Sequence, residues 1–161
     1  MTEQTEQRPA PSRSHKRFSG RRVLIVDDND FNRALMRAQC EMRGMTVVDS
    51  QNGSEALRLA KTLTLDLVFM DIHMPAMDGI EVAWRLCALL PVEQQPRIIA
   101  LSADAFVGER SLGLETLFDA FLLKPITDAA LDKTLDQCLH LPSPMQAAGA
   151  REQAFSRGGA A

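Results

Sequence analysis

Short apolar runs alternate with stretches of helical periodicity five times along the 161 residues of this chain, and few folds accommodate such a pattern. The runs cover residues 23–26, 46–48, 65–70, 97–101 and 120–123. Most are continuous rather than alternating, which is typical of strands covered on both faces. Strand–helix alternation of this kind predicts a parallel sheet with helices on both sides, and right-handed crossovers make the fold an α/β three-layer sandwich.

The segments between and after these runs predict five helices. The first carries an apolar stripe that ends at Gly44, a suitable C-terminal cap, and such a stripe normally faces the core. The stripe consists of Phe31, Ala34, Leu35, Ala38 and Met42. Ser54 can cap the second helix after the Asn52–Gly53 turn, and Thr127 begins the fifth. The third and fourth helices are predicted at 80–90 and 103–115.

Composition divides the chain into one folded segment and two terminal ones. Residues 1–21 are rich in Gln, Pro, Ser and Arg and are predicted to form a disordered basic arm, and the Gly- and Ala-rich residues 141–161 a disordered tail. The folded domain is expected at 22–140, which is long enough to bury a core. Because this segment is acidic while the arm is basic, a dedicated nucleic-acid groove is disfavoured.

Other features exclude further classes of protein. No apolar run approaches the roughly 20 residues of a membrane span, and the polar N-terminus has no signal-peptide core. Cys40, Cys87 and Cys138 lie far apart with no CxxC pair, so they are interpreted as reduced core thiols of a cytoplasmic protein. Structural zinc and disulfide scaffolds are therefore disfavoured.

Polar side chains follow four of the five apolar runs, at the edge where open parallel sheets bind ligands. They are Asp27 and Asp28 after the first run, Asp71 after the third, Ser102 after the fourth and Lys124 after the fifth. Three adjacent carboxylates repel one another unless a cation intervenes, and a hard divalent ion such as Mg²⁺ is the natural counter-charge. With Lys124 included, such a site could accept a dianionic phosphoryl group.

This arrangement predicts phosphoryl transfer to a carboxylate. Asp71 follows a buried strand, and an ionised carboxylate needs no base to act as a nucleophile. The metal and Lys124 would neutralise charge on the phosphoryl oxygens, while Ser102 could donate a hydrogen bond. Taken alone, the Asp27–Asp28 pair could also be a solvated turn or helix cap, and Asp71 could simply initiate a turn.

The segments VLIVDDNDFNR, VFMDIHMPAMDGIE, IIALSA and FLLKPI, in this order and spacing, resemble the receiver domain of two-component response regulators. The resemblance covers roughly residues 22–140, and DDNDFNR and MPAMDG are most similar to receivers appended to hybrid sensor histidine kinases. It implies a flavodoxin-like sheet of five parallel strands in the order 2-1-3-4-5 with five helices. It also implies a regulatory phosphoacceptor domain with self-directed phosphorylation and autodephosphorylation rather than an enzyme.

The resemblance assigns the metal site residue by residue. Asp71 is the phosphoacceptor and, with Asp28, a direct Mg²⁺ ligand. Asp27 acts through a metal-bound water, and the backbone carbonyl of His73 is the third protein ligand.

The resemblance also assigns residues to phosphoryl binding and to the conformational switch. Ser102 and Lys124 grip the phosphoryl group, and Ser102 with Phe121 forms the switch. The family also suggests a cis Lys124–Pro125 peptide bond. Asp104, two residues after Ser102, lies where the family tunes the hydrolysis rate.

The same resemblance names the expected partners. A sensor histidine kinase or histidine phosphotransfer protein supplies a phosphohistidine, and the downstream target is a protein not identified by the sequence. No DNA-binding domain is expected after residue 141, so the chain is interpreted as a single-domain regulator or the receiver of a hybrid histidine kinase.

Two departures from the family pattern stand out. Leu117 occupies the position where receivers usually place a Gly before strand five, so the preceding helix is expected to end differently. Phe121 lacks the phenolic hydroxyl of the commoner Tyr, so switching would rely on packing.

Two rival functions remain open. A haloacid dehalogenase-type Mg²⁺-dependent phosphatase also uses a strand-end Asp, but it places a second acid where this chain has His73. A non-phosphorylated, receiver-like interaction module is the other alternative, and the intact acid set disfavours it.

Overall fold

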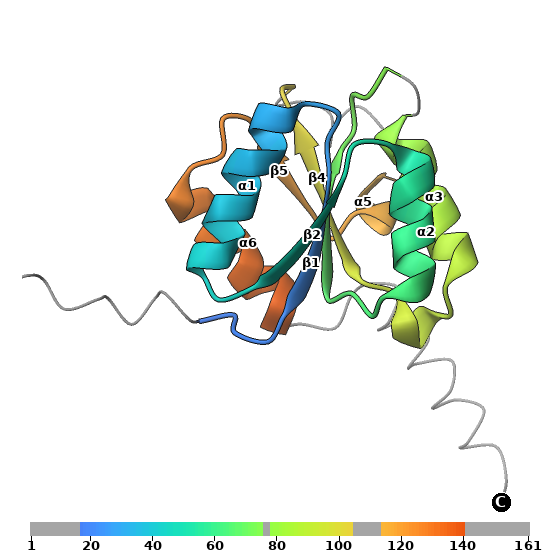
Figure 1. Ribbon diagram of the computed structural model, residues 1–161, viewed down its shortest axis with the longest axis horizontal. Coiled ribbons are helices and arrows are strands. Elements are labelled where there is room, and N and C mark those ends of the chain that lie inside the picture. The colour runs from blue at the N-terminus through green and yellow to red at the C-terminus, as the bar shows by residue number, and fades with distance from the viewer. Residues whose placement is uncertain (1–16, 76–77, 105–113, 141–161) are drawn as a thin grey trace, which may run out of the picture.

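The computed structural model describes residues 17–75, 78–104 and 114–140, and its centre is a five-stranded parallel sheet (Figure 1). The strands are β1 (Arg22–Val26), β2 (Thr46–Ser50), β3 (Leu67–Asp71), β4 (Arg97–Ser102) and β5 (Ala120–Leu123). Their order is β2-β1-β3-β4-β5. This confirms the α/β prediction and the strand order that the family resemblance implies.

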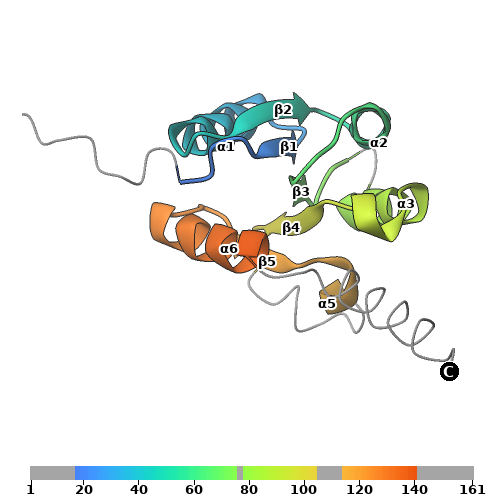
Figure 2. The same cartoon turned by 90° about the horizontal axis from the view of Figure 1, so that it is seen from below.

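Helices cover both faces of the sheet. They are α1 (Asp30–Met42), α2 (Gly53–Thr62), α3 (Gly79–Leu89), the 3₁₀ turn η2 (Val92–Gln94), α5 (Leu114–Leu117) and α6 (Asp128–His140). Figures 1 and 2 show α1 and α6 on one face and α2, α3 and α5 on the other. Most of the helix predicted at 103–115 lies outside the described residues. None of the described helices has the length and apolar character needed to cross a membrane.

The core consists of two hydrophobic layers separated by the sheet. On the α1–α6 side, Ile25, Phe69 and Ile99 pack together, whereas their neighbours Leu24 and Val68 pack on the α2–α3 side. All five residues of β3 are buried. Strands in the middle of such a sheet contact helices on both faces, which explains why their apolar runs are continuous.

The buried face of α1 differs from the prediction. All five residues of the expected core stripe are exposed, and Phe31, Leu35 and Met42 keep 73%, 52% and 57% of their surface. The helix instead buries Met36 and Cys40. Arg43 follows on the same face and pairs with α6, so its aliphatic stem fills a place where the sequence pattern leads one to expect a hydrophobic residue. The predicted C-cap Gly44 has a left-handed φ of 83°.

Ordered structure begins earlier than predicted. Within the described part of the N-terminal arm, Phe18 is buried in the core, and its backbone N–H donates to the Arg43 carbonyl at 3.1 Å. Arg17 forms an ion pair with Asp136 of α6. The prediction of disorder is therefore wrong for residues 17–21, because one aromatic side chain anchors them. Residues 1–16 and 141–161 lie outside the described residues.

Helix caps agree with the predictions in part. The α2 cap is Asn52 rather than Ser54, since its side chain accepts from the Glu55 N–H at 2.9 Å. Thr127 caps α6 by accepting from the Ala130 N–H at 3.2 Å.

The three cysteines are free thiols. Cys40 and Cys138 are buried and Cys87 is half-buried. Burial raises the pKa of Cys40 to about 12 and that of Cys138 to about 11, which keeps both thiols protonated and unreactive.

The entry into β5 shows how the chain accommodates Leu117. This side chain is buried in the core at the end of α5, and no non-glycine residue in the described segments has a positive φ. Asp119 then accepts from the Ile98 N–H at 2.8 Å and pairs with Arg97 at 3.4 Å. The helix therefore ends without the left-handed turn that a Gly would supply.

Candidate functional site

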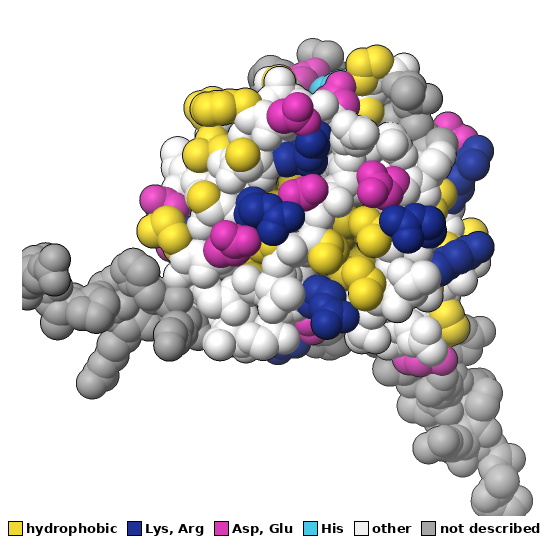
Figure 3. Space-filling model, in the orientation of Figure 1, with side chains coloured by type: hydrophobic (Ala, Val, Ile, Leu, Met, Phe, Trp, Pro, Cys, Tyr) yellow, Lys and Arg dark blue, Asp and Glu magenta, His cyan; other side chains and the backbone are white. Residues whose placement is uncertain are grey.

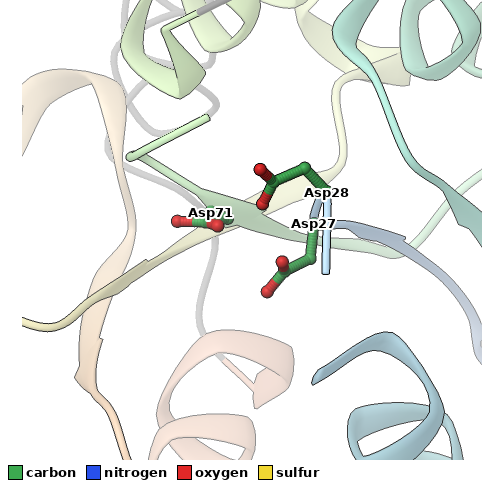
Figure 4. Close-up of side chains that lie close together, drawn as sticks. All are labelled: Asp27, Asp28 and Asp71. Carbon is green, nitrogen blue, oxygen red and sulfur yellow. The ribbon is translucent and has the colours of Figure 1, made fainter. Parts of the chain in front are cut away.

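Three carboxylates meet at the carboxyl edge of the sheet (Figure 4). Asp27 and Asp28 directly follow β1, and Asp71 is the last residue of the adjacent strand β3. One oxygen from each lies within 4.8 Å of the others, as expected for residues that end neighbouring parallel strands.

Asp27 is the most firmly held of the three. Its side chain is buried, Oδ1 accepts from the Asn29 N–H at 2.9 Å, and Oδ2 lies 3.2 Å from Lys124 Nζ. Its backbone N–H donates to the Ser50 carbonyl at 3.2 Å, and its carbonyl accepts from the Arg33 guanidinium at 2.8 Å. Asp28, in contrast, is exposed, so it can present its carboxylate to a ligand from solvent.

Lys124 completes the site from the far side of β3. The residue follows β5, its backbone N–H donates to the Ser102 carbonyl at 2.8 Å, and its peptide bond to Pro125 is cis. Its ammonium lies 3.2 Å from Asp27 Oδ2 and 3.5 Å from Asp71 Oδ2. This one ammonium therefore pairs with two of the three carboxylates, which leaves the cluster with excess negative charge.

Burial dominates the electrostatics of Asp71. Only 4% of the residue is exposed, and this desolvation raises the pKa of its carboxyl, with a further contribution from the Asp27 charge. The His73 N–H, which donates to Oδ1 at 3.0 Å, and the Lys124 ammonium act in the opposite direction on this pKa. A cation bound at the cluster would favour the ionised, nucleophilic form.

The other predicted site residues lie around this cluster. Ser102 ends β4, one residue beyond Leu101, which is the β4 partner of Asp71, and its hydroxyl both donates to and accepts from the Asp104 backbone. Phe121 is half-buried and packs edge-to-face on Phe118, with ring centroids 5.5 Å apart. His73 is exposed. The structure thus gathers the three acids and Lys124, while the hydroxyl of Ser102 is engaged with local backbone.

Gly79 is a further site residue, to which the sequence pattern assigned no role of its own. It is the first residue of α3, and a Cβ placed on it would lie 2.1 Å from the Asp71 carbonyl oxygen. Only glycine allows this close approach of helix and strand. The available signal was its position in MPAMDG, eight residues after Asp71.

A groove leads away from the cluster along α1. Its volume is about 370 Å³, and Asp27 and Lys124 contribute to its lining at the end nearest the cluster. Phe31 and Leu35 of α1 line one side, and Ile126 lines the other.

The donor chemistry of the cluster fits a hard divalent cation. All three side chains offer carboxylate oxygens, the ligands that Mg²⁺ prefers, and neither thiol nor imidazole belongs to the group. An exposed Asp28 leaves room for the waters that Mg²⁺ usually retains.

Comparisons with known proteins point the same way. The family model described as the response regulator receiver domain matches residues 23–136. The chain is 37% identical over 119 residues to the autoinducer 1 sensor kinase/phosphatase LuxN of Vibrio campbellii, covering 73% of this chain and 13% of LuxN. It is 38% identical over 113 residues to the histidine-protein kinase BarA of Escherichia coli K12, covering 70% of this chain and 12% of BarA. It therefore spans about an eighth of either kinase.

Solved structures include a close match in fold. The receiver domain of the sensor histidine kinase PA1611 from Pseudomonas aeruginosa PAO1 has a TM-score of 0.67 and 28% identity, covering 76% of this chain and all of that one. Its crystal structure is described as having a magnesium ion coordinated in the active site cleft.

Proposed function

We propose that this chain, which belongs to the response regulator receiver domain family of two-component phosphorelay systems, accepts a phosphoryl group on Asp71 from a partner phosphohistidine. The observation that carries the proposal is the convergence of three carboxylates from β1 and β3 opposite the Lys124 ammonium. A nucleophile at the end of a fully buried strand has a fixed backbone, so its carboxylate can be aimed at phosphorus.

Mg²⁺ is the proposed cofactor. Asp28 and Asp71 would hold it directly, Asp27 through a water and His73 through its carbonyl oxygen. When bound, it would supply positive charge to the phosphoryl oxygens as charge develops there. The all-carboxylate donor set and the magnesium ion in the PA1611 receiver support this assignment.

The chain's own groups perform the transfer. A carboxylate oxygen of Asp71 forms a bond to phosphorus while the phosphorus–nitrogen bond of the donor breaks, and the electron pair stays on the departing imidazole. Lys124, with Nζ 3.5 Å from Asp71 Oδ2, is placed to pair with a phosphoryl oxygen. Burial raises the pKa of Asp71, and positive charge beside it favours the ionised form that attacks phosphorus.

Phosphorylation would be read out through Ser102 and Phe121. If the Ser102 hydroxyl turns to a phosphoryl oxygen, it releases its two hydrogen bonds with the Asp104 backbone. Phe121 is only half-buried against Phe118, so it has space to repack. Such a change is a population shift driven by contacts that exist in one state only.

The exposed face of α1 is the proposed contact for the phosphohistidine-bearing partner. Figure 3 shows hydrophobic side chains along α1, and the most exposed large ones are Phe31, Leu35 and Met42. The adjoining groove ends at Asp27 and Lys124, so a partner seated there would reach the cluster. Exposed apolar surface of this kind commonly marks a protein interface.

A labelling assay with a small phosphodonor tests the proposal. Wild-type protein should become labelled only when Mg²⁺ is present, whereas Asp71→Asn should not be labelled. Asp66→Asn is a matched control, because Asp66 lies at the opposite end of β3 beside Arg22. Mg²⁺-dependent label in Asp71→Asn would refute the acceptor assignment, and repeated turnover of a phosphoester would favour the phosphatase alternative.

A further inference from the structure

We infer that Arg33 is a positioning residue that aligns Asp27 and Asp28 for the metal, an inference that rests on the proposed function. Its guanidinium Nη1 donates to the Asp27 carbonyl oxygen at 2.8 Å, and only 14% of its side chain is exposed. That carbonyl belongs to the peptide bond that joins the two acids. Arg33 therefore contacts the one backbone unit they share.

Peptide planarity explains why this contact is important. The Asp27 carbonyl, the Asp28 N–H and both Cα atoms lie in one plane, so fixing the carbonyl fixes the direction in which Asp28 leaves β1. Asp27 has other anchors in Asn29 and Lys124, whereas Asp28 is exposed. The Arg33 hydrogen bond consequently acts chiefly on the placement of Asp28.

The charge of Arg33 is balanced outside the metal cluster. Its Nη2 forms an ion pair with Asp30 in the first turn of α1, and Nε lies 3.9 Å from Asp49 of β2. Because these two carboxylates offset the positive charge of Arg33, the guanidinium repels a bound cation only weakly. The main effect of Arg33 on metal binding is therefore to hold the Asp27–Asp28 peptide in place. Only the planar fork of an arginine can reach all three partners at once.

Arg37 provides a matched control one helical turn later. Its guanidinium pairs with Asp49 at 2.5 Å and donates to the Val47 carbonyl at 3.2 Å, so it joins α1 to β2 as Arg33 does. Its hydrogen bonds are directed at β2 and Glu41 rather than at the Asp27 carbonyl. Replacing Arg37 thus removes a similar ion pair and leaves the Asp27–Asp28 peptide in place.

Calorimetric titration of the full chain with Mg²⁺ tests this inference, with the apo melting temperature measured alongside. Arg33→Gln should raise the Mg²⁺ dissociation constant about tenfold, as loss of a group that orients metal ligands typically does. Arg33→Lys keeps the charge but loses the fork, and should also bind Mg²⁺ more weakly. Arg37→Gln should bind as the wild type does.

Each result of the Mg²⁺ titrations has one interpretation. Unchanged or tighter Mg²⁺ binding by Arg33→Gln would overturn the inference, because tighter binding would mean that Arg33 acts only by charge repulsion. If Arg33→Gln does not fold, Arg33→Lys decides on the same criterion. A wild-type protein that does not bind Mg²⁺ would instead refute the proposed function itself, and Arg33 with it.

Discussion

The buried carboxyl of Asp71 is the proposed phosphoacceptor, and the same group, when ionised, lowers the free energy of unfolding. Burial and the nearby Asp27 raise its pKa, whereas Lys124 and the His73 N–H only partly compensate. A group with a raised pKa in the folded state stabilises the fold at low pH and loses that contribution as the pH rises through the folded pKa. Ionisation of Asp71, as the pH rises through its folded pKa, therefore disfavours the metal-free fold.

We expect Asp71→Asn to melt at a higher temperature than the wild type at pH 7 in EDTA. An amide keeps the size of the side chain and removes the buried charge. The difference should shrink as the pH falls towards the ordinary pKa of an Asp, where the wild-type carboxyl becomes protonated. Thermal unfolding of both proteins between pH 4 and 8 measures this, and a lower melting temperature for Asp71→Asn at every pH would contradict it.

At the scale of elements, α1 shows how a stripe pattern can mislead. The C-cap residue Arg43 buries its aliphatic stem and satisfies its charged end on α6, where it pairs with Asp132 at 2.7 Å and Asp128 at 3.0 Å. The apolar residues are then left on the outer face, where Phe31 and Leu35 are exposed. A helix that keeps hydrophobic side chains in water is available for a partner.

Leu35→Gln should slow phosphotransfer from a phosphohistidine donor about tenfold, because roughly 1.4 kcal/mol of docking free energy corresponds to that factor. Labelling by a small phosphodonor should not change, since this route needs no protein contact. Trp84→Gln is the control, because Trp84 is exposed to a similar extent on α3. The measurement is phosphotransfer profiling against histidine kinases of the same genome, and equal transfer rates for all three proteins would exclude α1 as the contact.

The connection between α5 and β5 allows a test of the residue that departs from the family pattern, Leu117. Leu117→Gly restores the usual residue, yet it should destabilise the protein by about 2–5 kcal/mol, because the buried side chain is lost and a cavity remains. Leu123→Gly, at a half-exposed position of β5, should cost only about 1 kcal/mol. Chemical denaturation gives both values, and a Leu117→Gly variant as stable as the wild type would show that the core closes around the gap.

On the scale of the whole molecule, the two edges of the sheet differ in charge balance. At the amino edge, acids are matched by arginines, as in Asp66 with Arg21 at 3.1 Å and Asp119 with Arg97 at 3.4 Å. At the carboxyl edge, three carboxylates cluster and Lys124 pairs with two of them. The described residues thus leave excess negative charge at one edge, which is where a cation would stabilise the fold most.

Mg²⁺ should therefore raise the melting temperature of the wild-type protein. An ion that binds only the folded state adds about 2.7 kcal/mol of stability when its free concentration is 100 times the dissociation constant. Asp71→Asn should show a smaller shift, because it lacks one proposed ligand, while Asp66→Asn should respond fully. Differential scanning calorimetry across a Mg²⁺ series provides the test, and an equal shift in Asp71→Asn would remove Asp71 from the ligand set.

The sequence alone was sufficient for the existence of the five strands and for the polar residues at the carboxyl ends of four of them, although β2 extends to Ser50, two residues beyond its predicted run. Continuous apolar runs and polar interruptions are local properties, and parallel pairing then brings Asp27, Asp28 and Asp71 to one edge whatever the details of packing. Their proximity could be predicted for that reason. Their individual roles stay predictions until Asp71 is labelled.

Only the tertiary structure decided which faces and contacts complete the site. The buried side of α1, the approach of Gly79 to the Asp71 carbonyl and the Arg33 contact with Asp27 depend on how helices pack against the sheet. A local sequence pattern predicts that an arginine is exposed, and it does not predict which distant residues pack against a glycine. Such contacts join residues distant in the chain, and packing that satisfies buried polar groups selects among several locally plausible arrangements.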